Sequence, residues 1–199
     1  MFNRTTLQGQ HVRLEPLSFE HKQGICDAIK DGDLNELFFT LVPHPDNVDA
    51  FIQIAIDQFE NDFGLTFATI DIKSGKVIGS TRFMQYQPAH KKCEIGFTFI
   101  AKSFQKSAIN TEAKLLMLTH GFETMQLIRM EFLTDYMNTT SRNAILRLGA
   151  KQEGILRNDR IMPNGRIRDS VIFSIISNEW AGVKQNLNFK LNNRALPSN

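Results

Sequence analysis

The sequence has few of the features that mark secreted, metal-bound or membrane-spanning proteins. Its two cysteines, Cys26 and Cys93, stand far apart without a CxxC or Cys/His pattern, which argues against a disulfide scaffold and a zinc site. No apolar run approaches the roughly 18 residues that span a bilayer. Residues 1–6 lead into no hydrophobic signal segment. These absences predict a cytoplasmic protein that uses neither a membrane nor a metal.

An excess of charge of one sign is also missing. Lys and Arg number 23 against 21 Asp and Glu, so the formal net charge is +2 at pH 7. Such a balance gives no general electrostatic reason to bind nucleic acid or anionic lipid. The chain has no linker, repeat or low-complexity tract, and 42% of its 199 residues are hydrophobic. We therefore expect one domain, 1–199, with a sizeable core.

Hydrophobic periodicity predicts an irregular succession of strands and helices. Strands are expected at 11–17, 65–72, 76–86, 93–100, 128–134, 151–162 and 166–177. Helices are expected at 18–30, 48–59, 111–125, 138–148 and about 178–191, followed by a frayed tail at 192–199. This order is neither strictly alternating nor all-β. It favours an α/β fold in which a mixed sheet carries helices on both faces.

The segment 94–114 runs from a strand through a polar loop into a helix. The free N–H groups and the dipole of a helix start can bind a pyrophosphate, and Lys106 adds a positive charge there. The loop is neither a Walker P-loop nor a GxGxxG loop, so its spacing alone favours an ordinary connection. Likewise, Asn138 or Thr139 at the start of the 138–148 helix is typical of a simple cap.

Several short motifs nevertheless occur together along nearly the whole chain. They are His11-Val-Arg-Leu-Glu-Pro-Leu, Ile78-Gly-Ser-Thr-Arg82, Glu94-Ile-Gly-Phe-Thr, the 105–110 loop, Asn138-Thr-Thr-Ser-Arg-Asn-Ala, Leu148-Gly-Ala, Glu153-Gly and Arg168-Asp-Ser-Val. In these motifs and in its order of elements, the chain resembles the GCN5-related N-acetyltransferase (GNAT) superfamily. The resemblance is to the RimJ/RimL-like branch in particular, which acetylates α-amines. It implies a twisted, mostly antiparallel sheet of about seven strands with a splayed central pair.

The resemblance also implies a site for acetyl-CoA as co-substrate. The family's loop pattern Q/R-x-x-G-x-G/A corresponds here to 105–110, where Ala108 and Asn110 replace the two small positions. A Cβ at position 108 costs little unless the site needs a positive φ, where it would cost about 1 kcal/mol or more. A bulge near Gly96 is expected to splay the strand and expose its edge. The implied cofactor-binding residues are Thr98, Phe99, Ile100, Gln105, Lys106, Ser107, Ala108, Ile109, Asn110 and Asn138.

Two catalytic roles are carried over from the same resemblance. Glu94 matches the position of the general base, which often acts through water. Ser141 matches the position that protonates the departing thiolate. The simpler alternatives are a solvated Glu94 paired with Lys91 or Lys92, and a helix-surface hydroxyl for Ser141.

The resulting prediction is an N-acetyltransferase that moves the acetyl group of acetyl-CoA to a primary amine by direct attack. The acceptor is a protein N-terminus, such as that of a ribosomal protein, or a small molecule, and the 34–46 loop does not choose between them. One alternative is a non-catalytic CoA-binding module with a degenerate cofactor loop. Another is an RNA-binding protein that uses the basic residues of the final hairpin. The simpler interpretation of these residues is a solvated strand edge protected by charge. The basic residues of that hairpin are Arg157, Arg160, Arg166 and Arg168.

Three chemically versatile side chains are predicted to have no catalytic role. Cys93 is expected to be buried in its strand and His120 to lie on the apolar face of its helix. His44 is expected to lie on a loop surface; the alternative is a contact with substrate, because the resemblance implies that this loop shapes the acceptor pocket. Dimers are common in the family that the chain resembles. Trp180 on the terminal helix is therefore a candidate contact for a homodimer.

Overall fold

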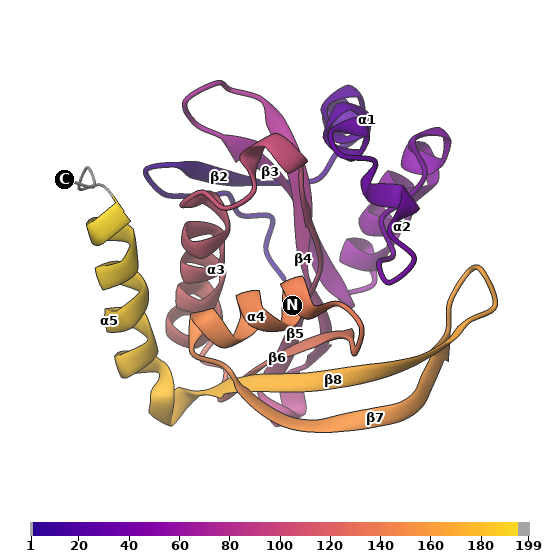
Figure 1. Ribbon diagram of the computed structural model, residues 1–199. Helices are drawn as coiled ribbons and strands as arrows, with labels where there is room; N and C mark the ends of the chain where they lie inside the picture. The colour runs from indigo at the N-terminus through magenta and orange to yellow at the C-terminus, as the bar shows by residue number, and fades with distance from the viewer. Residues whose placement is uncertain (1, 195–199) are drawn as a thin grey trace.

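The computed structural model describes residues 2–194, which form one eight-stranded sheet flanked by helices (Figure 1). Its strands are β1 (Leu7–Gln8), β2 (Val12–Pro16), β3 (Gly64–Asp71), β4 (Val77–Gln87), β5 (Lys92–Ile100), β6 (Arg129–Asp135), β7 (Lys151–Ile161) and β8 (Ile167–Ile176). Its α-helices are α1 (Lys22–Lys30), α2 (Val48–Glu60), α3 (Ile109–Thr119), α4 (Thr139–Leu148) and α5 (Ser177–Arg194). The predicted mixed α/β class is confirmed.

The sheet has one more strand than predicted. Its order is β1-β2-β3-β4-β5-β6-β8-β7, and every neighbouring pair is antiparallel except β5 and β6. The extra strand is β1, whose two residues pair with Leu14 and Arg13. A two-residue strand has no periodicity to detect, which explains why the sequence pattern missed it.

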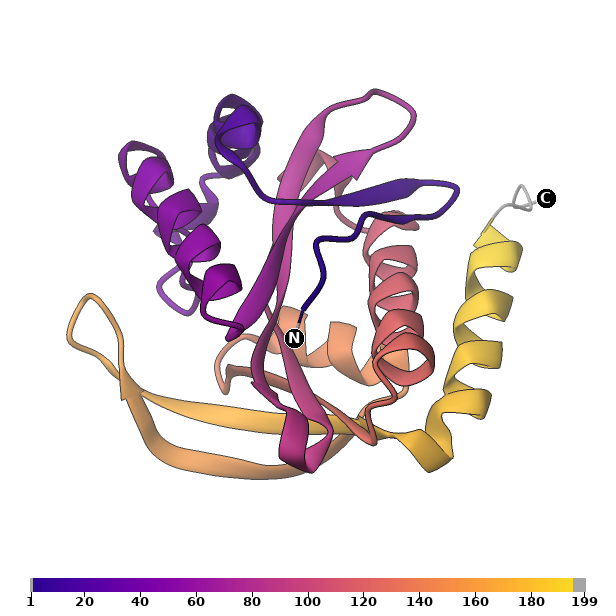
Figure 2. The ribbon, with the colours of Figure 1, turned by 180° about the vertical axis from the view of Figure 1, so that it is seen from behind.

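The helices divide between the two faces of the sheet (Figures 1 and 2). Helices α1 and α2 lie on one face, and the four residues of α2 that point inward, Val48, Phe51, Ile52 and Ala55, are buried as their spacing predicts. Helices α3 and α5 lie side by side on the other face. No helix within residues 2–194 is both long and apolar enough to cross a membrane.

The boundaries of three helices differ from the predicted ones. The predicted helix 18–30 begins as a 3-10 turn at Phe19–His21, and α1 starts only at Lys22. Helix α3 begins at Ile109, two residues earlier than expected, and ends at Thr119, where a π-helical turn continues to Thr124. Helix α5 runs from Ser177 to Arg194. The first part of the predicted frayed tail is therefore helical, and residues 195–199 lie outside the described part of the chain.

Trp180 anchors α5 within its own chain. Its side chain is 7% exposed, stacks on Phe122 with ring centroids 5.2 Å apart, and donates a 2.7 Å hydrogen bond from Nε1 to Oε1 of Glu123. The indole is therefore covered mainly by its own chain. A contact between two copies through the terminal helix stays a prediction.

The central strands β5 and β6 separate soon after they meet. They pair in parallel only from Lys92 to Glu94, opposite Arg129 to Glu131. Further along β5, the register against β4 shifts between Ser80 and Arg82, where Phe97 has a φ of 47°. This bulge confirms the one predicted near Gly96, and together with the short pairing it produces the expected splay.

The buried carboxylate of Glu112 fixes helix α3 to the edge of the sheet formed by β1 and β2. The two oxygens of Glu112 accept hydrogen bonds from the backbone N–H groups of Gln10, His11 and Val12 at 2.7–2.9 Å. Gly9 leaves room for this contact, because a Cβ there would lie 2.4 Å from Cδ of Glu112. The interaction satisfies three donors of the β1–β2 turn and holds α3 in place.

Replacing this carboxylate should destabilise the protein. The substitution Glu112→Ala leaves buried N–H donors without acceptors, so we expect a loss of roughly 2–4 kcal/mol in the free energy of unfolding. Urea denaturation measures it. The exposed Glu20→Ala is the matched control and should change stability by no more than about 0.5 kcal/mol. Equal effects of the two substitutions would contradict the assigned role of Glu112.

Candidate active site

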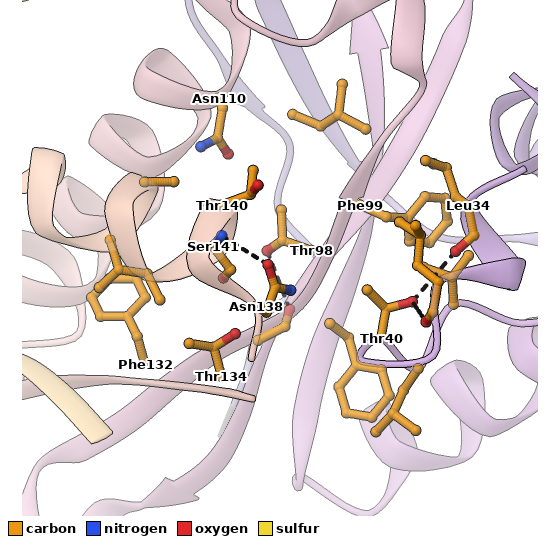
Figure 3. A pocket seen from close by; sticks show the side chains of 18 of the residues that line it. Leu34, Thr40, Thr98, Phe99, Asn110, Phe132, Thr134, Asn138, Thr140 and Ser141 are labelled. Atoms are coloured by element: carbon orange, nitrogen blue, oxygen red, sulfur yellow. Dashed lines mark hydrogen bonds between the residues drawn. The ribbon is translucent and has the colours of Figure 1, made fainter. Parts of the chain in front are cut away.

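The splay between β5 and β6 opens into a cavity of about 510 Å³ (Figure 3). Its walls come from β5, β6, the starts of α3 and α4, and the loop after α1 that contains Thr40. Figure 3 shows Thr98, Asn138 and Ser141 on one side of this space and Phe99 and Thr40 on the other. Residues far apart in the sequence are therefore brought to one cleft.

Most of the predicted site residues line this cavity. Those that do are Glu94, Thr98, Phe99, Ile100, Gln105, Lys106, Ser107, Asn110, Asn138 and Ser141. The two that do not are Ala108, the N-cap of α3, and Ile109, which is 4% exposed and belongs to the core. None of the described His, Cys, Asp and Glu side chains gather in threes as a metal site requires.

The loop before α3 is held by hydrogen bonds from its own side chains. Gln105 donates from Nε2 to the carbonyl of Ile100 at 2.8 Å, and the Ser107 hydroxyl donates to the carbonyl of Phe104 at 2.6 Å. These bonds fix the loop. The N–H of Ile109 donates to the Ser107 hydroxyl at 3.4 Å, whereas the N–H groups of Asn110 and Thr111 have no acceptor within the helix. Within this loop Lys106 has a positive φ of 59°, whereas Ala108 has a φ of −70°. The alanine therefore causes no backbone strain.

Asn138 and Ser141 lie at the start of α4. The side-chain Oδ1 of Asn138 accepts a 2.9 Å hydrogen bond from the backbone N–H of Ser141, drawn in Figure 3. The predicted capping role of Asn138 is thus confirmed, and its Nδ2 group stays available as a donor. The hydroxyl of Ser141 makes no hydrogen bond with other described residues and borders the cavity. It is free to interact with a bound molecule.

Glu94 lies where the strands part. Burial raises the pKa of its carboxyl group to about 7, a rise that Arg160 opposes and Glu131 reinforces. The glycine at position 96 leaves room for this carboxylate, because a Cβ on residue 96 would lie 3.0 Å from Oε1 of Glu94. The alternative pairing with Lys92 is not found, since Lys92 contacts Glu131 at 3.4 Å.

The arginines of the final hairpin are paired rather than free. Arg157 contacts Asp169, Arg160 contacts Asp159, and Arg166 contacts the fully buried Asp135. The fourth, Arg168, is 5% exposed and donates to the hydroxyl of Ser170 at 2.8 Å. Each of these four guanidinium groups therefore has a partner within its own chain, although the Arg157 side chain is still 78% exposed.

The other reactive side chains lie as the sequence suggested. Cys93 is fully buried, and burial raises the pKa of its thiol to about 12, so a thiolate nucleophile is disfavoured. His120 is half-buried with its ring 6.0 Å from that of Phe83. His44 is on a surface loop, where its Nδ1 accepts from the backbone N–H of Asp46.

Lys114 is a site residue that the sequence did not reveal. It lines the cavity from α3, is 5% exposed, and donates from Nζ to the hydroxyls of Thr81 and Thr98 at 2.8 and 2.7 Å. Burial lowers the pKa of its amine to about 7. In sequence it follows Ala113 within an amphipathic pattern and looks like an ordinary solvent-facing lysine. No local signal identifies it.

Comparison with known proteins gives the class of the molecule. The sequence pattern that defines the acetyltransferase (GNAT) domain matches residues 11–151. The chain therefore belongs to the GNAT family, and the predicted class, an acetyl-CoA-dependent N-acetyltransferase, is confirmed. Helix α5 lies outside the matched region.

Relatives agree with this assignment. The protein p20 of Bacillus licheniformis, named an N-acetyltransferase, is 26% identical over 182 residues, which cover 89% of this chain and 99% of that protein. YdaF of Bacillus subtilis, provisionally named a ribosomal N-acetyltransferase, is 33% identical over 110 residues. That match covers 55% of this chain and only 59% of YdaF.

A solved structure supports the fold over the whole molecule. The GCN5-related N-acetyltransferase of Brucella melitensis is 30% identical with a TM-score of 0.87. The similarity covers 98% of this chain and 89% of that one, so it includes the region of α5 as well as the central sheet.

The stability of the protein should depend on pH through Lys114. The unfolded chain keeps the ordinary lysine pKa of 10.5, and the folded chain has a pKa of about 7. Between these values the unfolded state binds more protons, so stability rises with pH, and below about pH 7 the full cost of the buried charge remains. Lys114→Met removes this cost. We expect the variant to be more stable than the parent at pH 6, with a difference that shrinks toward pH 10.

Urea denaturation at pH 6, 8 and 9.5 measures this difference. Lys30→Met, an exposed lysine at the end of α1, is the control and should show no such trend. A stability difference for Lys114→Met that stays constant across the three pH values would show that its amine titrates normally in the folded protein.

Proposed function

We propose that this protein transfers the acetyl group of acetyl-CoA to the α-amino group of a protein N-terminus by direct attack. The observation that carries the proposal is one continuous cavity that joins the N-terminus of α3 to Glu94. An anion site and a carboxylate with a pKa near 7 are the two groups that this chemistry needs. The chain acts as one domain in this proposal, because α5 packs on α3.

The cofactor site is assigned to the loop and strand already described. The first-turn N–H groups of α3, with Lys106, bind the pyrophosphate. The pantetheine arm pairs with the free edge of β5 at 98–100, and Nδ2 of Asn138 donates to it. The proposal needs no glycine at Ala108, since the helical φ of that residue leaves the amides directed as a helix start requires.

Glu94 is the proposed general base. The attacking α-amine must lose a proton as its nitrogen forms a bond to the thioester carbon, and a carboxylate with a pKa near 7 accepts that proton readily. The proton passes directly or through one water. Arg160 and Arg168 are near enough to influence the carboxylate, and they favour its ionised form before the proton arrives.

Ser141 is the proposed general acid. As the carbon–sulfur bond breaks, its hydroxyl gives a proton to the departing CoA thiolate. The hydroxyl is available for this purpose, because the backbone N–H of Ser141, rather than its side chain, completes the α4 cap. Asn138 therefore positions both the cofactor and the acid.

A protein acceptor is supported by the surface beside the cavity. Leu37 and Phe38 are 38% and 50% exposed on the loop before α2, and the Arg166 guanidinium lies 5.4 Å from the Phe38 ring centre. Exposed apolar side chains beside an amine site suit a peptide chain better than a small polar molecule. The provisional name of YdaF agrees with a ribosomal protein as acceptor. Both cysteines are free, which suits the cytoplasm, where we place the reaction.

Glu94 should control the pH dependence of turnover. With a peptide acceptor, kcat/KM should rise with pH through about 7 as Glu94 loses its proton, and again near 8 as the α-amine does. Glu94→Gln should lower kcat by about 10²–10⁴-fold and abolish the step near pH 7, leaving the step of the amine. Thiol release measured from pH 5.5 to 9 tests this. A step near pH 7 that survives in the variant would remove Glu94 from the role of base.

Ser141 should affect the chemical step and not cofactor binding. Ser141→Ala should lower kcat by about 10–100-fold while the Kd for acetyl-CoA, measured by calorimetry, stays within about twofold. The exposed Asn143→Ala on the same helix is the control and should leave both quantities unchanged. An unchanged kcat in Ser141→Ala would assign protonation of the thiolate to another donor.

The acceptor class can be tested separately. Peptides copied from the N-termini of ribosomal proteins should be acetylated with a kcat/KM at least about tenfold above that of single amino acids or amine antibiotics. Leu37→Ser together with Phe38→Ser should lower kcat/KM for the peptides and leave small amines unaffected. The opposite preference would indicate a small-molecule acceptor on the same catalytic apparatus.

A further inference from the structure

The final hairpin places two arginines opposite each other at the cleft. Arg160 on β7 lies directly opposite Arg168 on β8, and both residues line the cavity that contains Glu94. The hairpin extends toward the side of the molecule where α1 and α2 lie, away from α3 and α5 (Figures 1 and 2). Like charges directly opposite each other destabilise a pair of strands. The two arginines therefore cost stability unless an anion binds between them.

A chain of hydrogen bonds holds each of the two guanidinium groups by one nitrogen. Nε of Arg168 donates to Oγ of Ser170 at 2.8 Å, and that hydroxyl donates to Oδ2 of Asp159 at 2.7 Å. Nε of Arg160 donates to the same Oδ2 atom at 3.0 Å. The terminal nitrogens of both arginines form no hydrogen bond with any of residues 2–194. These nitrogens are left as donors for a bound molecule.

Arg168 is a buried cation without an ion pair among residues 2–194. The residue is 5% exposed, and burial lowers the pKa of its guanidinium, with a further decrease from Arg160. The carboxylates of Asp135 and Asp159 act on Arg168 from a greater distance, but they pair with Arg166 and Arg160. Apart from the proposed base, three guanidinium groups thus face two carboxylates. A buried charge needs a partner, so one positive charge is left for a ligand.

We propose that Arg160 and Arg168 bind a carboxylate of the acceptor, namely the acidic side chain of one of the first two residues of the peptide. This inference rests on the proposed function. Both arginines act on the Glu94 carboxylate, which receives the proton of the α-amine, so the group that they bind lies close to that amine. Successive Cα atoms of a peptide are about 3.8 Å apart, which limits the choice to the first residues.

The charge balance favours a carboxylate over a phosphate. One excess positive charge is neutralised by one carboxylate, whereas a phosphate group with two charges would place a surplus negative charge beside the proposed base. The planar guanidinium group also matches the geometry of a carboxylate, to which it donates two parallel hydrogen bonds. An acceptor with Asp or Glu near its N-terminus is therefore the substrate class that this site selects.

Paired peptides that differ in one side chain test the inference. Peptides with Glu or Asp at the first or second position are compared with the same peptides carrying Gln or Asn, and thiol release gives kcat and KM. The wild-type protein should acetylate the preferred acidic peptide with a kcat/KM at least about tenfold above that of its amide partner, mainly through a lower KM. Each ratio compares two substrates of one enzyme, so any effect of a variant on the proposed base cancels.

Three variants assign this preference to the two arginines. Arg160→Gln and Arg168→Gln should each reduce it to within about threefold by raising the KM of the acidic peptide. Arg157→Gln removes the same charge from the same hairpin at a residue that pairs with Asp169 outside the cavity, so it should keep the full preference. Thermal unfolding shows which variants are folded. Arg160 is only partly buried, so its variant still tests the inference if Arg168→Gln does not fold.

A free amino acid carries its own carboxylate beside the amine and is the other source of the same group. We expect its kcat/KM to be at least about tenfold below that of the acidic peptide. A higher kcat/KM for free amino acids, lost in both arginine variants, would assign the arginines to the α-carboxylate and overturn the inference.

Two further results would overturn the inference. One is equal kcat/KM for the acidic peptides and their amide partners, and the other is a preference that both arginine variants keep. In each case peptides are still acetylated and the proposed function stands. Failure of the wild-type protein to acetylate any of these peptides would contradict the proposed function as well.

Discussion

The early separation of β5 from β6 is the constraint on which the rest of the site depends. Main-chain pairing between these parallel strands ends at Glu94 and Glu131. The backbone N–H and C=O groups that follow on β5 therefore form no hydrogen bonds with β6. The bulge at Phe97 then alters the direction of the strand. Because α3 and α4 both begin beside the gap, their N-terminal groups and the free strand edge face one cavity. A closed sheet would offer none of these groups to a ligand.

This cavity holds groups that a stable core would exclude. Glu94 and Lys114 are ionisable and desolvated, and burial moves both of their pKa values toward neutrality from opposite directions. Asn110 adds a buried oxygen that has no hydrogen-bond partner among residues 2–194. Such groups cost stability, whereas the surrounding carboxylates of Glu112 and Asp135 are fully used in structural contacts. Desolvated ionisable groups such as Glu94 and Lys114 therefore line the cavity, whereas carboxylates with several hydrogen-bond partners stabilise the surrounding fold.

The residues that line the cavity could be predicted from the sequence where they are local, and not where they are distant in the chain. Asn138 and Ser141 lie three residues apart, so a cap at a helix start could be anticipated, and the strand carrying Glu94 leads directly into the cofactor loop. Lys114 was missed because its partners are Thr81 and Thr98 on two strands of the sheet. The burial of Trp180 depends on distant residues in the same way, since Phe122 and Glu123 contact it from another segment.

The sequence by itself determined the mixed α/β class, nearly every element, the bulge in β5 and the family, because periodicity and short motifs are local properties of the chain. It also determined that Asn138 stands at the start of α4. Only the tertiary structure decided the pKa values of Glu94 and Lys114 and the pairing of the hairpin arginines. These properties depend on desolvation and on contacts between segments far apart in the chain, and neither exists until the sheet and helices have packed.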